Sequence, residues 1–327
     1  MADLNTEFGT FYDRIALTSG KKAALRKSRD AIRTRIRSHF SGSLRVKVPK
    51  FLGQGSYAMG TTVNPLDGEF DIDDGVYLQH LDGRDNTKWP TPGTVHAWLV
   101  QATDGHTNEK PVDKQTCVRV QYAGQYHVDL PSYAEHNGEY MLSDKGSRGW
   151  HRSDPLGLTL WFRRTVKQNG EQLRRIVRYL KAWADFQSAR RGKMPSGLIL
   201  TALAVENFRG TERDDLCFAN TARSMFAATG QVLRVHNPVD SEEELTARLS
   251  PEQKARFQEA ILALAADAVA AVETDDREKA AKLWRRQFGD RFPSVEHRIE
   301  IQQQRKDANG LAAFYGARSP SKPWAHY

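Results

Sequence analysis

The sequence is poor in cysteine and has no long apolar run. Only 2 of its 327 residues are cysteine, Cys117 and Cys217, which is too few for a disulfide framework or a four-ligand zinc site. No segment approaches the roughly 18 consecutive apolar residues of a membrane-spanning helix. The acidic start MADLNTEFGTFYD lacks the basic and apolar regions of a secretory signal. We therefore expect a cytoplasmic protein that enters no membrane and holds no structural zinc.

The sequence also lacks internal repeats and low-complexity tracts. Apolar residues make up 39% and charged residues 27%, which are ordinary proportions for a globular enzyme. The formal net charge of +8 favours polyanionic partners, and nucleoside triphosphates (NTPs) meet that description as well as nucleic acids do. Composition alone does not separate these two partners from a merely basic surface.

A basic helix is predicted from about Gly20 to Phe40. Apolar residues recur at helical spacing along one of its sides, from Leu25 onwards. Basic residues form a second stripe that steps by three or four positions, at Lys22, Arg26, Arg29, Arg33 and Arg37. This stripe could follow a phosphate backbone, or it could be a solvated face beside the apolar one. The sequence leaves both interpretations open.

The pattern changes from strands to helices along the chain. Short strand-like runs lie between Val46 and Leu130, and two of them, TCVRVQY and YHVDL, flank residues 123–125 and predict a hairpin. After about Trp161 the pattern is mainly helical, with the clearest cases in EQLRRIVRYLKAWADF and in the capped segment that begins at Ser250. We therefore expect an α+β protein with a helical second half.

Three aspartates in the strand-rich part carry the clearest chemical signal. Asp71 and Asp73 alternate with apolar residues, so on a strand both carboxylates face the same side. Asp129 offers a third carboxylate on a neighbouring strand. Side-by-side carboxylates repel unless a cation lies between them, and Mg²⁺, with Mn²⁺ as an alternative, suits a site whose substrates are phosphates. The pattern predicts two metal ions that hold a transferring phosphoryl group.

A glycine-containing loop, Gly53-Gln54-Gly55-Ser56, precedes these aspartates. Glycine lets backbone amides approach phosphate oxygens, and a serine hydroxyl adds one more donor. Each signal is weak alone, because Gly-x-Gly-Ser and Asp-x-Asp also occur in plain turns. Their order along the chain, with the loop first, then the aspartate pair and then Asp129, makes the combination specific.

At these residues the chain resembles the DNA polymerase β-type nucleotidyltransferase superfamily. Within it, the chain is similar to bacterial cyclic-oligonucleotide synthases, the CD-NTase family, which are relatives of animal cyclic GMP-AMP synthase and of oligoadenylate synthase. Gly55-Ser56 matches the family's Gly-Ser motif, Asp71-Ile72-Asp73 its Asp-x-Asp motif, and Asp129 its third metal ligand. The spacing from Ser56 to Asp71 is longer than in the superfamily at large, and cyclases of this branch also carry a long insert there.

The resemblance implies a polymerase β-like palm with a long N-terminal helix in residues 1–165, and a helical lobe in residues 166–327 that closes the nucleotide cleft. It implies that a lysine and a serine of the helical lobe grip the triphosphate, and Lys181 and Ser196 match those positions. From the other lobe, the triphosphate would be bound by Gln54, Gly55 and Ser56. Considered without the resemblance, Lys181 could be an exposed helix lysine and Ser196 a plain N-cap.

The implied reaction joins NTPs, ATP and GTP foremost, into a cyclic di- or trinucleotide second messenger with release of pyrophosphate, in bacterial anti-phage signalling. We expect regulatory protein partners from an anti-phage operon, and no obligatory nucleic acid. Two alternatives remain: a template-independent transferase that modifies RNA or protein, and a non-enzymatic nucleic-acid sensor. The sequence shows neither an added RNA-binding domain nor the clustered His and Cys of a zinc insertion, so we rank the synthase first.

Overall fold

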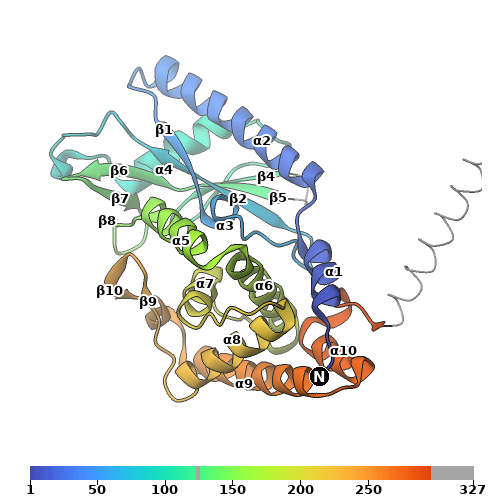
Figure 1. The fold of residues 1–327 in the computed structure, drawn as a ribbon. Coiled ribbons are helices and arrows are strands. Elements are labelled where there is room, and N and C mark those ends of the chain that lie inside the picture. Colours follow the sequence, from blue (N-terminus) through green and yellow to red (C-terminus); the bar gives the residue numbers. More distant parts are fainter. Residues whose placement is uncertain (123–125, 296–327) are drawn as a thin grey trace, which may run out of the picture.

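The computed structural model describes residues 1–122 and 126–295. Figure 1 shows a strand-rich part crossed by the long helix α2, with a group of helices beneath it that extends to α10. The helices are α1 (Asn5–Ile15), α2 (Ser19–Ser38), α3 (Gly55–Met59), α4 (Pro92–Thr103), α5 (Pro155–Asn169), α6 (Glu171–Arg191), α7 (Gly197–Glu206), α8 (Asp214–Thr229), α9 (Pro251–Glu273) and α10 (Arg277–Phe288). The expected α+β class is confirmed.

One mixed sheet forms the strand-rich part, in the order β3-β4-β5-β2-β6-β7-β8, with β1 also paired to β2. Its strands are β1 (Lys50–Gln54), β2 (Phe70–Tyr77), β3 (Val112–Asp113), β4 (Val118–Tyr122), β5 (Tyr126–Leu130), β6 (Ser132–His136), β7 (Glu139–Ser143) and β8 (Trp150–Arg152). β2 pairs in parallel with β5 through its first half and with β6 near its end. Pro131 separates β5 from β6, because a proline has no N–H to donate to the ladder.

Most predicted elements appear where the sequence pattern placed them. The hairpin is confirmed as the antiparallel pair β4 and β5, although its turn at 123–125 lies outside the described residues. Ser250 caps α9 through a complete capping box with Gln253. The strand pair β9 (His236–Asn237) and β10 (Asp240–Glu244) adds a small second sheet. Helix α1 was not among the predicted elements.

The apolar stripe of α2 covers one face of the sheet and so decides which face is left for chemistry. Ile32 and Ile36 are fully buried in one cluster with Phe70, Ile72 and Val128 from β2 and β5. Because side chains alternate along a strand, burying these residues under α2 turns the intervening aspartates to the opposite face. Packing therefore fixes the orientation that the sequence pattern predicted.

A second core lies among the helices. Phe8 and Phe11 of α1 are fully buried there, and Phe8 makes edge-on ring contacts with Tyr179 of α6 and Trp284 of α10 at 5.1 and 5.0 Å between centroids. Helix α1 thus packs with the helices of the second half, although the predicted division assigns it to residues 1–165. That division stays a prediction.

The basic stripe of α2 is partly built into the fold, and it is not simply a solvated face. The Arg33 guanidinium donates to both carboxylate oxygens of Asp74, with Nε 2.7 Å from Oδ2. Asp74 is fully buried and directly follows Asp73 on β2. Arg33 and Arg37 also lie over the Phe51 ring, at 5.4 and 4.9 Å from its centroid. One residue of the stripe is therefore committed to holding the central strand.

Arg33→Ala is expected to lower the free energy of unfolding by about 2 kcal/mol, because it leaves the buried Asp74 carboxylate without its counter-charge. Urea unfolding, monitored by circular dichroism, measures the change in the free energy of unfolding. Lys27→Ala, an exposed position on the same helix, is the matched control and should stay within about 0.5 kcal/mol of the parent. An apolar pair, Arg33→Met with Asp74→Leu, should recover most of the loss. Equal stability of Arg33→Ala and Lys27→Ala would contradict this account.

Candidate active site

Asp71, Asp73 and Asp129 lie on two neighbouring strands in one register. The parallel pairing of β2 with β5 sets Asp73 beside Asp129 and Asp71 beside His127. The Asp71 side chain is 43% exposed, whereas that of Asp129 is 11% exposed. All three carboxylates are on the sheet face opposite α2, as the alternation predicted.

Asp129 carries a partner that the sequence analysis did not identify. Arg119 of β4 lies directly across the hairpin from Asp129. Its Nε and Nη2 atoms each donate to one carboxylate oxygen of Asp129 at 2.7 Å. This two-point ion pair fixes the orientation of the third carboxylate and offsets part of its charge.

Burial dominates the electrostatics of Asp73. The pKa of Asp73 is raised well above its usual range, first by burial and then by the nearby charges of Asp71 and Asp129, against the opposing effect of Lys181 and Arg119. A carboxylate in this position is poorly stabilised in its charged form. A divalent cation beside Asp71 and Asp73 would supply the missing positive charge, so this donor set fits such an ion.

His127 is a second residue that the sequence analysis missed. Its side chain is 9% exposed, and Nε2 lies 3.9 Å from Asp71 Oδ2 and 3.9 Å from Asp129 Oδ2. Burial lowers the pKa of His127, so the imidazole is neutral near pH 7 with one nitrogen lone pair free. Asp71, His127 and Asp129 together form a group that could hold a metal ion.

The predicted glycine-serine loop forms the junction between β1 and the short helix α3. Gly55, the first residue of α3, has a φ of +65°, and a Cβ atom there would collide with the Asp73 carboxylate. Only glycine therefore allows the loop to pack directly against Asp73. The Ser56 hydroxyl lies 2.9 Å from Thr62 Oγ1, and the Gln54 amide donates to the Tyr133 hydroxyl at 2.9 Å.

Lys181 reaches the segment that follows α3 from the helical part. It lies on α6, and its Nζ donates to Thr61 Oγ1 at 3.0 Å. Gly197, the first residue of α7, leaves room for it, since a Cβ there would lie 3.1 Å from Lys181 Cε. Burial lowers the pKa of Lys181 to about 8, against the attraction of Asp71 and Asp73. The ammonium is thus hydrogen-bonded to Thr61 and attracted by the Asp71 and Asp73 charges, and Lys181 is not an exposed helix lysine.

These groups line one cavity of about 370 Å³, here called the central cavity, together with residues of α5 and α7. Its lining residues include all three predicted loop residues, two of the aspartates and the lysine, namely Gln54, Gly55, Ser56, Asp71, Asp73 and Lys181. A cavity of about 210 Å³, the histidine cavity, shares Ser56, Asp71 and Lys181 with it and adds His127. A third, the neighbouring cavity of about 390 Å³, shares Leu158 and Leu198 with the central cavity.

Ser196 and Asp129 lie at the edge of this arrangement. Ser196 is the exposed N-cap residue of α7, and the residue after it, Gly197, lines the central cavity in its place. Asp129 does not line the central cavity. It lies next to the site because one of its carboxylate oxygens is close to ligand atoms of Asp71 and His127. A role for Ser196 in triphosphate binding stays a prediction.

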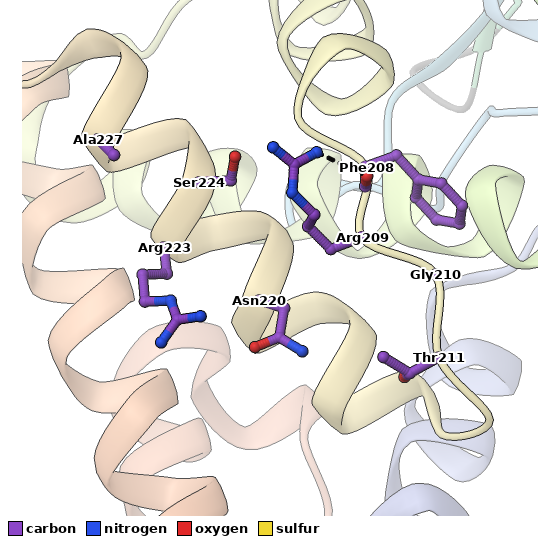
Figure 2. A pocket seen from close by; sticks show the side chains of 8 residues that line it. All are labelled: Phe208, Arg209, Gly210, Thr211, Asn220, Arg223, Ser224 and Ala227. Carbon is purple, nitrogen blue, oxygen red and sulfur yellow. Dashed lines mark hydrogen bonds between the residues drawn. The ribbon is translucent and has the colours of Figure 1, made fainter.

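A larger cavity, of about 600 Å³, lies away from the carboxylates, between the α7–α8 connection and α8. Figure 2 shows Arg209 and Arg223 at this cavity, with Asn220 and Thr211 along α8 and the loop. Among its described lining residues none carries a carboxylate. It therefore offers no ligand set for a divalent ion, and size alone does not mark the site of chemistry.

No helix in the described part of the chain is long and apolar enough to cross a membrane.

Two family models match separate parts of the chain. The model described as "Cyclic GMP-AMP synthase DncV-like, nucleotidyltransferase domain" matches residues 49–133, and "Cyclic GMP-AMP synthase, C-terminal domain" matches residues 170–300. The first contains Gln54 to Ser56 and all three aspartates, and the second contains Lys181 and Ser196.

Curated relatives carry related names. A cyclic GMP-AMP synthase of Escherichia albertii is 28% identical over 257 residues, which cover 73% of this chain and 55% of the relative. A cyclic AMP-AMP-GMP synthase of Enterobacter hormaechei is 26% identical over 254 residues, covering 75% of this chain and 57% of the relative. The chain thus spans little more than half the length of these relatives.

A solved structure shows the same fold. The apo form of Vibrio cholerae DncV superposes with a TM-score of 0.74 at 20% identity, and the match covers 90% of this chain and 97% of that one. The predicted polymerase β-like palm with a helical second lobe is thereby confirmed.

Proposed function

The chain belongs to the family of DncV-like nucleotidyltransferases, and we propose that it joins nucleoside triphosphates into a cyclic di- or trinucleotide with release of pyrophosphate. The observation that carries this proposal is the central cavity. In it the Asp71 and Asp73 carboxylates face a glycine-serine loop from one lobe and Lys181 from the other. Metal-binding carboxylates opposite phosphate-binding groups are what phosphoryl transfer requires.

The residues around the cavity would have two roles, binding of the triphosphate and binding of divalent ions. The backbone amides at Gly55 and Ser56 and the Lys181 ammonium would bind the triphosphate of the donor nucleotide. Asp71, Asp73 and Asp129 would hold divalent ions, Mg²⁺ in the first instance and Mn²⁺ as an alternative. When bound, such ions lower the pKa of a hydroxyl and stabilise negative charge on phosphate oxygens.

The transfer step is a displacement at phosphorus. A ribose hydroxyl oxygen of the acceptor nucleotide forms a bond to the α-phosphorus of the donor, and the bond from that phosphorus to the bridging oxygen breaks. Pyrophosphate leaves with the electron pair of the broken bond. The hydroxyl proton passes to a carboxylate at the site or to water. A second transfer closes the ring or lengthens the product.

A cavity beside the proposed donor site has room for the acceptor nucleotide. The neighbouring cavity adjoins the central cavity at Leu158 and Leu198, and it is lined by Arg148, Arg152 and Asn237. Both guanidinium groups are already ion-paired, Arg148 with Asp144 and Arg152 with Asp240, so a second triphosphate would bind there by displacing these carboxylates. Solved relatives have been described in complex with ATP and GTP, so we propose these two nucleotides as the substrates.

Incubation of the purified, nuclease-treated protein with Mg²⁺ and all four radiolabelled NTPs tests the proposal. With the label in the α-phosphate, phosphatase releases it from unreacted NTPs, whereas both linear and cyclic products keep the label of their internal linkages. A linear product loses its 5′-triphosphate and changes mobility, but a cyclic product has no terminal phosphate and should be unchanged by phosphatase. Omitting one NTP at a time identifies the bases used. If activity appears only when RNA or a protein acceptor is added, the chain is a modifying transferase, and the proposal is wrong.

Lys181→Ala is expected to raise the KM for NTP about 10- to 100-fold, equivalent to ~1–3 kcal/mol of lost charge-assisted binding. Steady-state kinetics at fixed Mg²⁺ measure this change. Lys193→Ala removes an exposed lysine from the connection between α6 and α7, and it should leave KM unchanged. Equal KM values for the two variants would make Lys181 a residue of the fold and not of the site.

The pH profile of Lys181 gives an independent check. Its pKa of about 8, lowered by burial, means that the free enzyme loses this positive charge as the pH rises through 8. The ratio kcat/KM reports ionisations of the free enzyme, so it should fall above about pH 8 in the parent protein. In Lys181→Ala this fall should be absent, because no ammonium remains to deprotonate.

A further inference from the structure

His127 presents an unsatisfied nitrogen to the carboxylates. Nε2 is buried and has no hydrogen-bond partner in the described part of the chain. Its distance of 3.9 Å to the nearest oxygens of Asp71 and Asp129 is too long for a hydrogen bond to either. Leaving a buried polar atom without a partner is costly, so the position of this nitrogen indicates that something other than the protein chain contacts it.

The strand register directs this nitrogen and two carboxylate oxygens into one space. His127 and Asp129 are two residues apart on β5 and so share a face, and Asp71 lies opposite His127 on β2. One ligand atom from each of the three residues lies within 4.8 Å of the other two. The histidine cavity, which both Asp71 and His127 line, gives access to this space.

The two separations from His127 Nε2 are compatible with ligands of a single ion. Two ligand atoms at about 2.1 Å from one ion lie about 3.0 Å apart at a right angle and about 4.2 Å apart when opposite. The two 3.9 Å separations fall between these limits. We propose that His127 is a direct nitrogen ligand of the divalent ion held by Asp71 and Asp129. This inference rests on the proposed function, which places divalent ions at these carboxylates.

A nitrogen ligand changes which ions the site prefers. Mg²⁺ strongly favours oxygen ligands, whereas first-row transition ions also accept imidazole, with affinity rising from Mn²⁺ to Co²⁺. The site should therefore bind Mn²⁺ and Co²⁺ in preference to Mg²⁺. Glutamine at position 127 offers oxygen and amide groups in place of the imidazole. His127→Gln should therefore lower the ratio of Mn²⁺ affinity to Mg²⁺ affinity about tenfold. Calorimetric titration with each ion alone measures the affinities from which this ratio is calculated.

Pulsed electron paramagnetic resonance of the Mn²⁺-loaded protein tests direct ligation. Inorganic pyrophosphate is added as the phosphate probe, because it contains no nitrogen. The expected spectrum shows modulation from a directly bound ¹⁴N nucleus, which changes to the ¹⁵N pattern when the protein is labelled with ¹⁵N-histidine. His127→Gln should lose the modulation. His106→Gln should keep it, since His106 Nε2 is already hydrogen-bonded to the Tyr122 hydroxyl at 2.7 Å.

The outcomes separate this inference from the proposed function. Bound Mn²⁺ without nitrogen modulation, or modulation that persists in His127→Gln, overturns the role of His127 and leaves the carboxylate site intact. A failure of Mn²⁺ to bind overturns the metal site itself, and with it both proposals. If His127→Gln does not fold by circular dichroism, the ¹⁵N-histidine spectrum of the parent protein still decides whether a histidine nitrogen is bound.

Discussion

Asp71→Asn is expected to lower kcat for nucleotide joining at least about 10³-fold, or about 4 kcal/mol in the barrier. The amide keeps the shape of the side chain but removes the charge that would hold a divalent ion. Asp73→Asn should have an effect of the same size, because both residues line the central cavity. Product formation from radiolabelled NTPs with Mg²⁺ measures the loss.

The same substitution should leave the folded protein intact or make it more stable. The pKa of Asp73 is raised by burial and, after that, by the Asp71 and Asp129 charges. Removing the Asp71 charge relieves part of this repulsion, so the free energy of unfolding should be unchanged or higher. Asp67→Asn, at an exposed position in the loop before β2, is the control and should retain parental activity. Near-normal turnover of Asp71→Asn would remove this residue from the metal site.

Strand alternation was enough to predict the face of the candidate site. Phe70 and Ile72 are apolar and flank Asp71, so any buried strand through this segment must place its aspartates on the opposite face. The predicted hairpin also determines which residues lie beside Asp129. If residues 123–125 form the turn, Arg119 falls opposite Asp129, and His127 shares its face with Asp129. The positions of Arg119 and His127 beside Asp129 could therefore have been predicted from register alone.

Contacts between elements that are distant in the sequence could not be predicted in this way. The basic stripe of α2 gave no indication that Arg33 would meet Asp74, because that contact depends on how the helix lies across the sheet. Helix α1 was missed although Phe8, Phe11 and Ile15 recur at helical spacing, since it contains Gly9 and no side chain caps its start. Its stability comes from burial against α6 and α10, which local propensity does not record.

Gly55→Ala is expected to lower kcat about 100-fold, because a methyl group at this position would displace the Asp73 carboxylate by roughly an ångström or more. Gly55 has a φ of +65° and the Asp73 carboxylate is its nearest neighbour. The substitution should also cost about 1 kcal/mol of stability, since an alanine rarely adopts this left-handed backbone. Kinetics with NTPs and urea unfolding measure the two effects separately.

Gly68→Ala separates the two causes. Gly68 has a similar φ of +79°, but a Cβ atom there would meet nothing within 4 Å. It should therefore lose the same ~1 kcal/mol of stability and keep kcat within about twofold. If both variants lose activity equally, backbone strain explains the effect and the close packing of Gly55 on Asp73 has no catalytic meaning. If only Gly55→Ala loses activity, the loop positions the carboxylate as well as binding the triphosphate, and the absence of a side chain at Gly55 is part of the active site.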